Sequence, residues 1–443
     1  MKGARTLAVL VLLLAGLSAY LYFVDAEKPV GEVDDKPKVF AVEADQIEEL
    51  KVSTVAGGVA ELKKTGEDWQ LTSPHAAAAD QAEVSGITSN LASVTMQRVV
   101  DDNPANLGDY GLREPVVEVS FKVKGASGFK TLQLGTKTPT GSDMYAKTAD
   151  DNKVFLVFGY LESSFNRTPF DLRDKRILSF DRDKVDRIEI RRDDRLVSLV
   201  KANGEWRITA PVEARADFSA VEGLLSRLGS AQMTAVVSED PAQFAGYGLN
   251  RPVAEVTVTS GSSKAQLAFG TSGGDNAVHV RDMSRPMVAT VGSDLLDEIS
   301  KPASDFRRKD IFEFRAFNLD TLEITRDGAT KVYERLKGKG EGGADLWQIA
   351  GANTPLDGTK IEPALSRLAG LRAQSFADPR TPTGLDAPAV TIKAVFDDRK
   401  KSETVTIGRV GGDVFAGREG EPGAAKLDAT EFDEAIKAFD DLD

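Results

Sequence analysis

The sequence has 443 residues, 41% of them hydrophobic and 28% charged, which indicates a globular chain too long for one core of ordinary size. Its formal net charge of −13 argues against nucleic acid and against an anionic membrane surface as partners. It has no cysteine, which excludes disulfides, thiolate metal sites and cysteine nucleophiles.

The first element expected is a membrane anchor over residues 1–24. Its uncharged run from Thr6 to Val24 would measure about 28 Å as a helix, close to the thickness of a bilayer core. Lys2 and Arg5 precede the run, so the positive-inside rule sends the rest of the chain outward. The alternative is a signal peptide cleaved after Ala26.

A tether over residues 25–38 leads into three copies of one sequence pattern. The tether is charged, contains proline and lacks periodicity. Each copy repeats Gly-Leu-x-x-Pro, and the glycines lie 137 and 136 residues apart. The motif residues are Gly111, Gly248 and Gly384 with Pro115, Pro252 and Pro388. We expect each glycine to adopt a positive φ and each proline to occupy the first position of the next strand.

The order of elements is also repeated. Strands are predicted from Ile47, Arg187 and Thr321, and a second strand follows each of them. A third strand carries the chain's three tryptophans, Trp69, Trp206 and Trp347, which we interpret as core anchors rather than ligand platforms. An aspartate stands 11, 11 and 10 residues later, at Asp80, Asp217 and Asp357, where it would cap a helix. Asp80 with Glu83 resembles a capping box.

Up to four alternating runs and a short helix close each copy. The sequence therefore predicts an α+β fold: an N-terminal transmembrane helix, then three tandem repeats, each a mostly antiparallel sheet with one main helix and a short closing helix. The predicted domains are residues 39–177, 178–311 and 312–443.

A ten-residue motif behaves differently because it occurs only between copies. Asp171–Phe180 matches Asp305–Phe314 without a gap. The shared residues are Asp171/Asp305, Arg173/Arg307, Lys175/Lys309, Ile177/Ile311 and Phe180/Phe314. One interpretation is an inter-domain clamp, in which the apolar residues are buried between neighbours and the arginines pair with carboxylates of the adjoining copy. The other is a basic docking face for a partner.

At the tryptophan strand, the Tyr-Gly-Leu-x-x-Pro turn, the Leu134-Gly135 strand end and the Leu-Arg-Asp-Lys-Arg-Ile-Leu junction, the chain resembles the bacterial family named domain of unknown function 4340. The third copy has Thr383 in place of tyrosine. The resemblance implies a membrane-anchored protein facing the periplasm of the inner membrane. It also implies ABC-type permeases and auxiliary subunits as partners, and it offers no catalytic residues.

The sequence shows little reactive chemistry. It has no phosphate loop and no nucleophile elbow, and its two histidines, His75 and His279, fall at different places in their copies. Asp102–Asp109 could hold a weak Ca²⁺, although its spacing does not match an EF-hand. We therefore expect no catalytic, metal or cofactor residues, and a non-enzymatic accessory, scaffold or binding subunit of an envelope ABC-type transport system. The alternative is an envelope glycan hydrolase that uses paired carboxylates.

Overall fold

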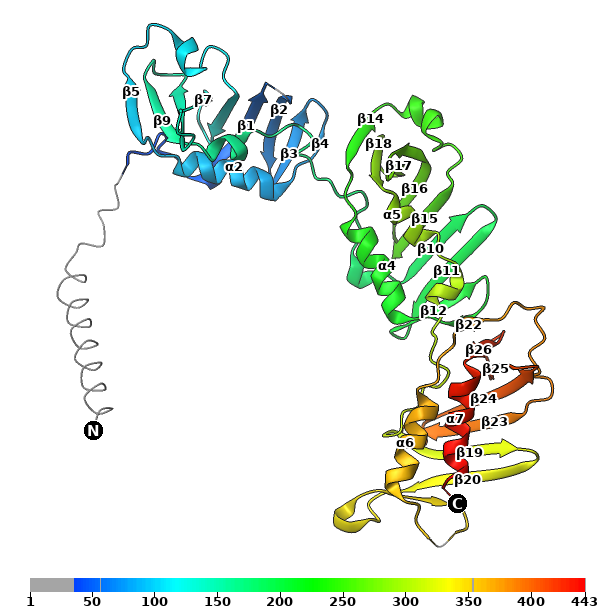
Figure 1. Ribbon diagram of the computed structural model, residues 1–443. Coiled ribbons are helices and arrows are strands. Elements are labelled where there is room, and N and C mark those ends of the chain that lie inside the picture. Colours follow the sequence, from blue (N-terminus) through cyan, green and yellow to red (C-terminus); the bar gives the residue numbers. More distant parts are fainter. Residues whose placement is uncertain (1–35, 56, 353, 443) are drawn as a thin grey trace, which may run out of the picture. The chain divides into compact units, whose positions relative to one another are not determined.

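The computed structural model describes residues 36–55, 57–352 and 354–442 (Figure 1). The chain divides into two compact units, one up to Lys175 and one from Arg176 onward. The predicted anchor and residues 25–35 of the predicted tether lie outside the described residues. Within the described part, every helix is too short or too polar to cross a bilayer.

The first unit contains one nine-stranded sheet, in the order β4-β3-β2-β1-β6-β7-β8-β9-β5. Helices α2 and α3 accompany it. The elements are η2 (Ala44–Gln46), β1 (Ile47–Thr54), β2 (Gly58–Thr65), β3 (Asp68–Ser73), β4 (Ala77–Ala78), α2 (Gln81–Ser93), β5 (Arg98–Asp101), η3 (Leu107–Tyr110), β6 (Val117–Val123), β7 (Lys130–Lys137), β8 (Asp143–Thr148), β9 (Val154–Phe158) and α3 (Leu161–Phe165).

The second unit contains two sheets, and the earlier one has nine strands in the order β13-β12-β11-β10-β15-β16-β17-β18-β14. Its elements are η4 (Arg182–Lys184), β10 (Arg187–Arg192), β11 (Arg195–Ala202), β12 (Glu205–Ala210), β13 (Ala214–Arg215), α4 (Phe218–Ser230), β14 (Ala235–Ser238), η5 (Pro241–Tyr247), β15 (Ala254–Ser260), β16 (Ser263–Gly274), β17 (Ala277–Asp282), β18 (Val288–Gly292), α5 (Ser293–Ile299) and η6 (Ala303–Phe306).

The later sheet of the second unit has eight strands, in the order β21-β20-β19-β23-β24-β25-β26-β22. Its elements are β19 (Leu319–Arg326), β20 (Ala329–Leu336), η7 (Glu341–Gly343), β21 (Leu346–Ile349), α6 (Gly358–Ala369), β22 (Ser375–Phe376), β23 (Val390–Phe396), β24 (Lys401–Val410), β25 (Asp413–Arg418), β26 (Ala425–Leu427) and α7 (Ala429–Asp440).

The three sheets share one topology. Subtracting nine from each strand number of the second sheet reproduces the order of the first. The third sheet keeps that order, and the single bridge between Gln348 and Pro355 takes the place of the outer two-residue strand, β4 or β13. The strand pairings are antiparallel, as in the pairs of β1 with β2 and with β6. An α+β fold of three antiparallel sheets with few helices is therefore what the chain adopts.

The main helix of each sheet begins where its aspartate predicts. Asp80, Asp217 and Asp357 each accept hydrogen bonds from backbone N–H groups of the first helical turn. The reciprocal half of a capping box is absent at α2, so that part of the prediction is wrong. The Asp80 N–H donates to the Leu172 carbonyl, and the Glu83 carboxylate pairs with Arg167 at 2.8 Å.

The tryptophans lie in the cores. Trp69, Trp206 and Trp347 are 5%, 3% and 4% exposed. The backbone carbonyl of each tryptophan accepts from the residue that precedes the capping aspartate: Ala79, Ala216 or Leu356. The tryptophan strand therefore sets both the core and the start of the helix.

The Gly-Leu-x-x-Pro turn docks on a second glycine. Gly111 and Gly248 have φ of 68° and 75°, the left-handed conformation in which a side chain is strained. The turn lies so close to the end of β7 that a Cβ on Gly135 would come within 2.1 Å of the Tyr110 carbonyl oxygen. Gly270 stands in the same relation to the carbonyl of Tyr247. This close approach explains why the turn and the strand-end glycine occur together in the sequence.

The prolines lie two residues before the strands that they were expected to begin. Pro115, Pro252 and Pro388 precede β6, β15 and β23. The residue after the proline already donates to the neighbouring strand in two copies, from Val253 to Phe269 and from Ala389 to Ile407. The proline therefore stands just outside the ladder, and its missing N–H costs no ladder hydrogen bond.

Candidate functional site

The two junction segments, residues 171–180 and 305–314, are bound at their first halves to the copy that precedes them. In the first unit, Asp174 donates to Ala78, and Arg173 bridges Ala79. In the second unit, Arg308 donates to the Arg215 carbonyl and Asp217 donates to Phe306. The first half of each segment thus pairs with the chain at the outer edge strand of its sheet, β4 or β13, just before the capping aspartate.

The second halves are bound to the copy that follows. Ile177 donates its N–H to the carbonyl of Ala231, directly after α4. Ile311 donates in the same way to Leu371, directly after α6, and Ala373 donates back to Lys309. Each segment therefore changes partner near its middle, at residues 175–176 and 308–309.

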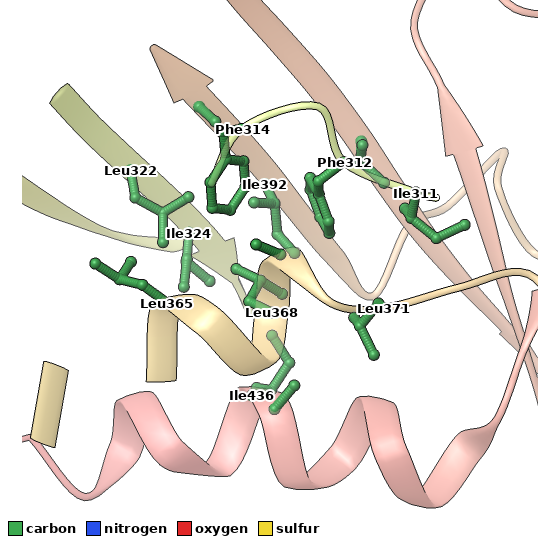
Figure 2. Close-up of a cluster of buried hydrophobic side chains, with 14 of the residues drawn as sticks. Ile311, Phe312, Phe314, Leu322, Ile324, Leu365, Leu368, Leu371, Ile392 and Ile436 are labelled. Atoms are coloured by element: carbon green, nitrogen blue, oxygen red, sulfur yellow. The ribbon is translucent and has the colours of Figure 1, made fainter. Parts of the chain in front are cut away.

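The apolar side chains follow the same division. Leu172 belongs to the core of the first sheet. Ile311, Phe312 and Phe314 belong to the core of the third, and Figure 2 shows Phe312 and Phe314 on either side of Ile392 of β23. Our expectation of burial between neighbouring copies is wrong for Phe314, because the third copy's own helix and sheet surround it.

The other predicted apolar residues lie in different environments. Ile177 is fully buried, whereas Phe180 is half-buried. The Phe180 ring lies near Gly229 on α4, and a Cβ added to that glycine would be 3.6 Å from the ring edge. Phe180 therefore covers the helix from outside instead of entering the core.

The aspartate and the lysine of the first junction segment form hydrogen bonds with residues close to them in sequence. The Asp171 carboxylate accepts from the Thr168 N–H and hydroxyl at 2.9 and 2.8 Å. Burial acts to raise the pKa of Asp171, but these hydrogen bonds outweigh it and the pKa is lowered. Lys175 donates to the Asp171 carbonyl. Asp305 and Lys309 are exposed.

The arginine position of the second junction enters a cluster between the second and third sheets. Arg307 lies 3.9 Å from the Glu421 carboxylate and donates to the Pro422 carbonyl. Its guanidinium lies over the Phe376 ring, 4.1 Å from the centroid. Burial lowers the pKa of Arg307, and Glu421 opposes that effect. Arg307 therefore lies near a carboxylate of the adjoining copy.

Residues that sequence reasoning missed complete this junction charge cluster. Arg215 of β13 binds Glu421 and lies 3.3 Å from Glu313. Arg418 of β25 binds Glu403, whose carboxylate also accepts the Glu313 N–H at 3.0 Å. The cluster consists of Arg215, Arg307, Glu313, Glu403, Arg418 and Glu421. The repeat gives no signal for it, because Arg215 stands where the first copy has Ala78.

An open hollow of about 780 Å³ lies beside this cluster on the third sheet. Its charged groups already pair with one another: Asp310 lies 3.1 Å from Arg372 and 3.6 Å from Arg315. Arg335 lies over the Trp347 ring, 5.1 Å from its centroid, and 3.5 Å from Asp345. The hollow offers shape and paired charge rather than a reactive group.

The aspartates whose pKa departs clearly from its usual value in the described chain have it lowered. They are Asp171, Asp181, Asp320, Asp357, Asp398 and Asp440. A lowered pKa keeps a carboxyl charged, which suits hydrogen bonding and ion pairing. A general acid for glycan cleavage needs a raised pKa.

At the segment Asp102–Asp109, which we considered for a weak Ca²⁺, the carboxylates of Asp109 and of the adjacent Asp101 already accept hydrogen bonds from protein donors. Asp101 accepts from the Asn103 N–H and the Tyr110 hydroxyl, and Asp109 accepts from the Asn106 amide. The hydrogen bond to Asp101 raises the pKa of Tyr110. Across the residues that the structure describes, no group of three or more histidine or acidic side chains could hold a metal ion.

Three antiparallel sheets of one topology, joined by segments that are shared between neighbours, define a tandem-repeat α+β protein. The chain belongs to the family described as domain of unknown function (DUF4340), whose model matches residues 69–205 and 206–388. The two matched stretches begin at Trp69 and Trp206, which are the second residues of β3 and β12. Each stretch contains one junction segment.

No curated protein matches the chain. Among solved structures, the chain is similar to a DNA polymerase sliding clamp from Pseudomonas aeruginosa at 7% identity, over 87% of this chain and 91% of that one. The TM-score of 0.15 is too low to show a shared fold.

Proposed function

We propose that this protein is a membrane-anchored, non-enzymatic subunit of an envelope ABC-type transport system. In this role residues 1–24 span the inner membrane, and the three sheets stand in the periplasm as a scaffold or binding arm for the permease and its auxiliary protein. The anchor is supported by the uncharged run from Thr6 to Val24 behind Lys2 and Arg5.

The observation that carries the scaffold role is how the polar groups at the second junction are used. Arg215, Arg307 and Glu421 are 10–13% exposed and bind one another across the second and third sheets. Ion pairs that are largely shielded from solvent in this way favour one relative arrangement, because removing either partner leaves a costly unpaired charge. A protein that positions partners needs such fixed junctions more than it needs a reactive cleft.

The test is recovery of the full chain from gently solubilised membranes, followed by mass spectrometry of what accompanies it. We expect permease and auxiliary subunits. The matched control replaces residues 1–24 with a cleavable signal, which should leave the three sheets in the periplasm but release them from the membrane. A wild-type chain that begins at Glu27 and stays soluble would refute the anchor.

The glycan-hydrolase alternative is separated by a second measurement. The purified chain is incubated with envelope glycan, and the products are followed by chromatography. Cleavage that disappears on replacing one carboxylate would overturn the non-enzymatic role.

A further inference from the structure

Two aromatic side chains stand exposed at one end of the first sheet. Phe158 ends β9 and is 44% exposed, and Tyr160 follows it and is 55% exposed. Their rings stack with centroids 6.0 Å apart. On the neighbouring edge strand β5, Val99 and Val100 are 39% and 37% exposed. Exposed aromatic and aliphatic groups gathered at a sheet edge mark an interaction surface.

The feature is specific to the first copy. Phe158 pairs with Asp143 in the register of β8 and β9, and Gly292 holds the same place opposite Ala277 in the second sheet. Tyr160 then corresponds to Asp294, which is a charged residue. The shared topology therefore does not require aromatic residues here, since the second sheet folds without them.

The described chain enters the first sheet at this same place. The Lys36 ammonium donates to the Gln97 side chain at 2.7 Å and lies 6.0 Å from the centroid of the Phe158 ring. Lys38 bridges Thr95, and the next strand begins at Arg98. The aromatic pair is thus next to the point from which the chain leads back to residues 1–35.

Chain length decides what can reach this surface. Eleven residues, 25–35, separate the apolar run from Lys36, and they span at most about 40 Å when fully extended. If residues 6–24 cross a bilayer, the aromatic pair lies within that distance of the membrane surface. Tyrosine and phenylalanine beside lysine and arginine are the side chains that favour the headgroup region.

We infer that Phe158 and Tyr160 form a membrane-interface contact that holds the first sheet against the lipid headgroups. This inference rests on the anchor of the proposed function. Because the attraction comes from aromatic rings rather than net charge, a zwitterionic surface suffices, which is compatible with the chain's charge of −13. The contact would give the first sheet a fixed orientation at the membrane surface.

The test places a tryptophan reporter in the full chain, reconstituted in phosphatidylcholine nanodiscs with or without bromine on the upper acyl chains. Bromine quenches tryptophan on contact, and the three native tryptophans are at most 5% exposed. We expect Phe158→Trp to lose most of its added emission in brominated discs. Phe129→Trp is the matched control: Phe129 is 49% exposed and precedes β7, whose first residues pair with the end of β8 farthest from Phe158.

A third variant carries Tyr160→Asp together with Phe158→Trp. Tyr160 is exposed and directly precedes α3 with a helical backbone conformation, and a negative charge at a helix N-terminus is favourable, so folding should be unaffected. The charge should move the reporter away from the headgroups and restore its emission. Recovery of emission would support the inference.

Failure of this inference is distinguishable from failure of the anchor. A chain that stays in the discs while the emission of Phe158→Trp is the same in both lipids overturns the membrane contact and leaves the proposed function standing. A chain that leaves the discs refutes both. A reporter that is unquenched in discs, with a photo-crosslinker at position 160 that captures a protein in intact envelopes, would also overturn the inference and assign the surface to a partner.

Discussion

The second and third copies cover their main helices, α4 and α6, with different elements. In the second, the seven-residue α5 is followed by η6, and Phe306 of η6 packs with α4 and β12. In the third, the twelve-residue α7 packs along α6 and contributes Phe432 and Phe439 to the core. Where the second copy has β13, the third has the single bridge between Gln348 and Pro355.

This difference shows what the junction segment does for the copy that it leaves. It supplies one buried aromatic or aliphatic residue and a short pairing beside the capping aspartate. In the third copy, the longer helix α7 supplies buried aromatic residues. The motif is thus part of the fold of its neighbours.

The largest expected effects come from removing the closing aromatics themselves. Phe306→Ala and Phe439→Ala should each lower the free energy of unfolding by about 3–5 kcal/mol, because both rings are at most 3% exposed. Hydrogen exchange should show the loss in the second copy for Phe306 and in the third for Phe439. Phe317→Ala, at a ring that is 79% exposed, is the control and should change little. If either variant lowered hydrogen-exchange protection equally in both copies, the idea that each aromatic residue stabilises only its own copy would be contradicted.

Breaking the junction charge cluster should cost somewhat less but act on both copies. Glu421→Gln removes the carboxylate that Arg215 and Arg307 share and leaves Arg215 with Glu313 alone, which we expect to cost about 3 kcal/mol. It should also broaden the distance distribution in small-angle scattering. The control, Asp440→Asn, breaks the exposed Arg326 pair and should cost at most about 1 kcal/mol. If the two variants behaved alike, the cluster would not hold the two sheets together.

Alanine substitutions of the turn glycines compare how strongly the second and third copies depend on the same turn. Gly248→Ala places a Cβ 2.8 Å from the Thr271 methyl group at positive φ, and we expect a cost of about 1–2 kcal/mol in denaturant titration. Gly384→Ala should cost more, because its Cβ would meet the Arg409 backbone oxygen at 2.7 Å. Gly223→Ala, in open space on α4, should be neutral or stabilising. A larger loss from Gly248 than from Gly384 would contradict this ranking.

The smallest effect concerns acid stability of the third copy. Burial acts to raise the pKa of Asp320, but hydrogen bonds from Lys337 and the Arg399 N–H outweigh it, so the pKa is lowered. The stabilisation is therefore complete above the unfolded value, about 3.9, and is lost as the pH falls through the folded value. We expect Asp320→Asn to flatten the loss of stability of the third copy below about pH 4. An unchanged slope would show that other groups control it.

Repetition made much of the fold predictable. Trp69, Trp206 and Trp347 mark one place in three copies, and the capping aspartates follow at fixed spacing, so the elements could be aligned. The junction charge cluster could not be found in this way. Glu421 meets Arg215, and Glu403 meets Arg418, only through folding, so no spacing in the sequence reports them. The burial of Ile311 in one copy's core likewise depends on where the segment changes partner.

The central position of β1 has a consequence for how the matched stretches relate to the folded sheets. β1 joins β2 to β6, and the stretch 69–205 begins after both β1 and β2. A fragment cut at those limits would hold two incomplete halves: β3 to β9 without their middle strand, and β10 and β11 without β15. The period of the sequence and the period of the structure are equal in length but out of phase. Fragments meant to fold alone should therefore be cut inside the junction segments, where the backbone changes partner, rather than at the tryptophans.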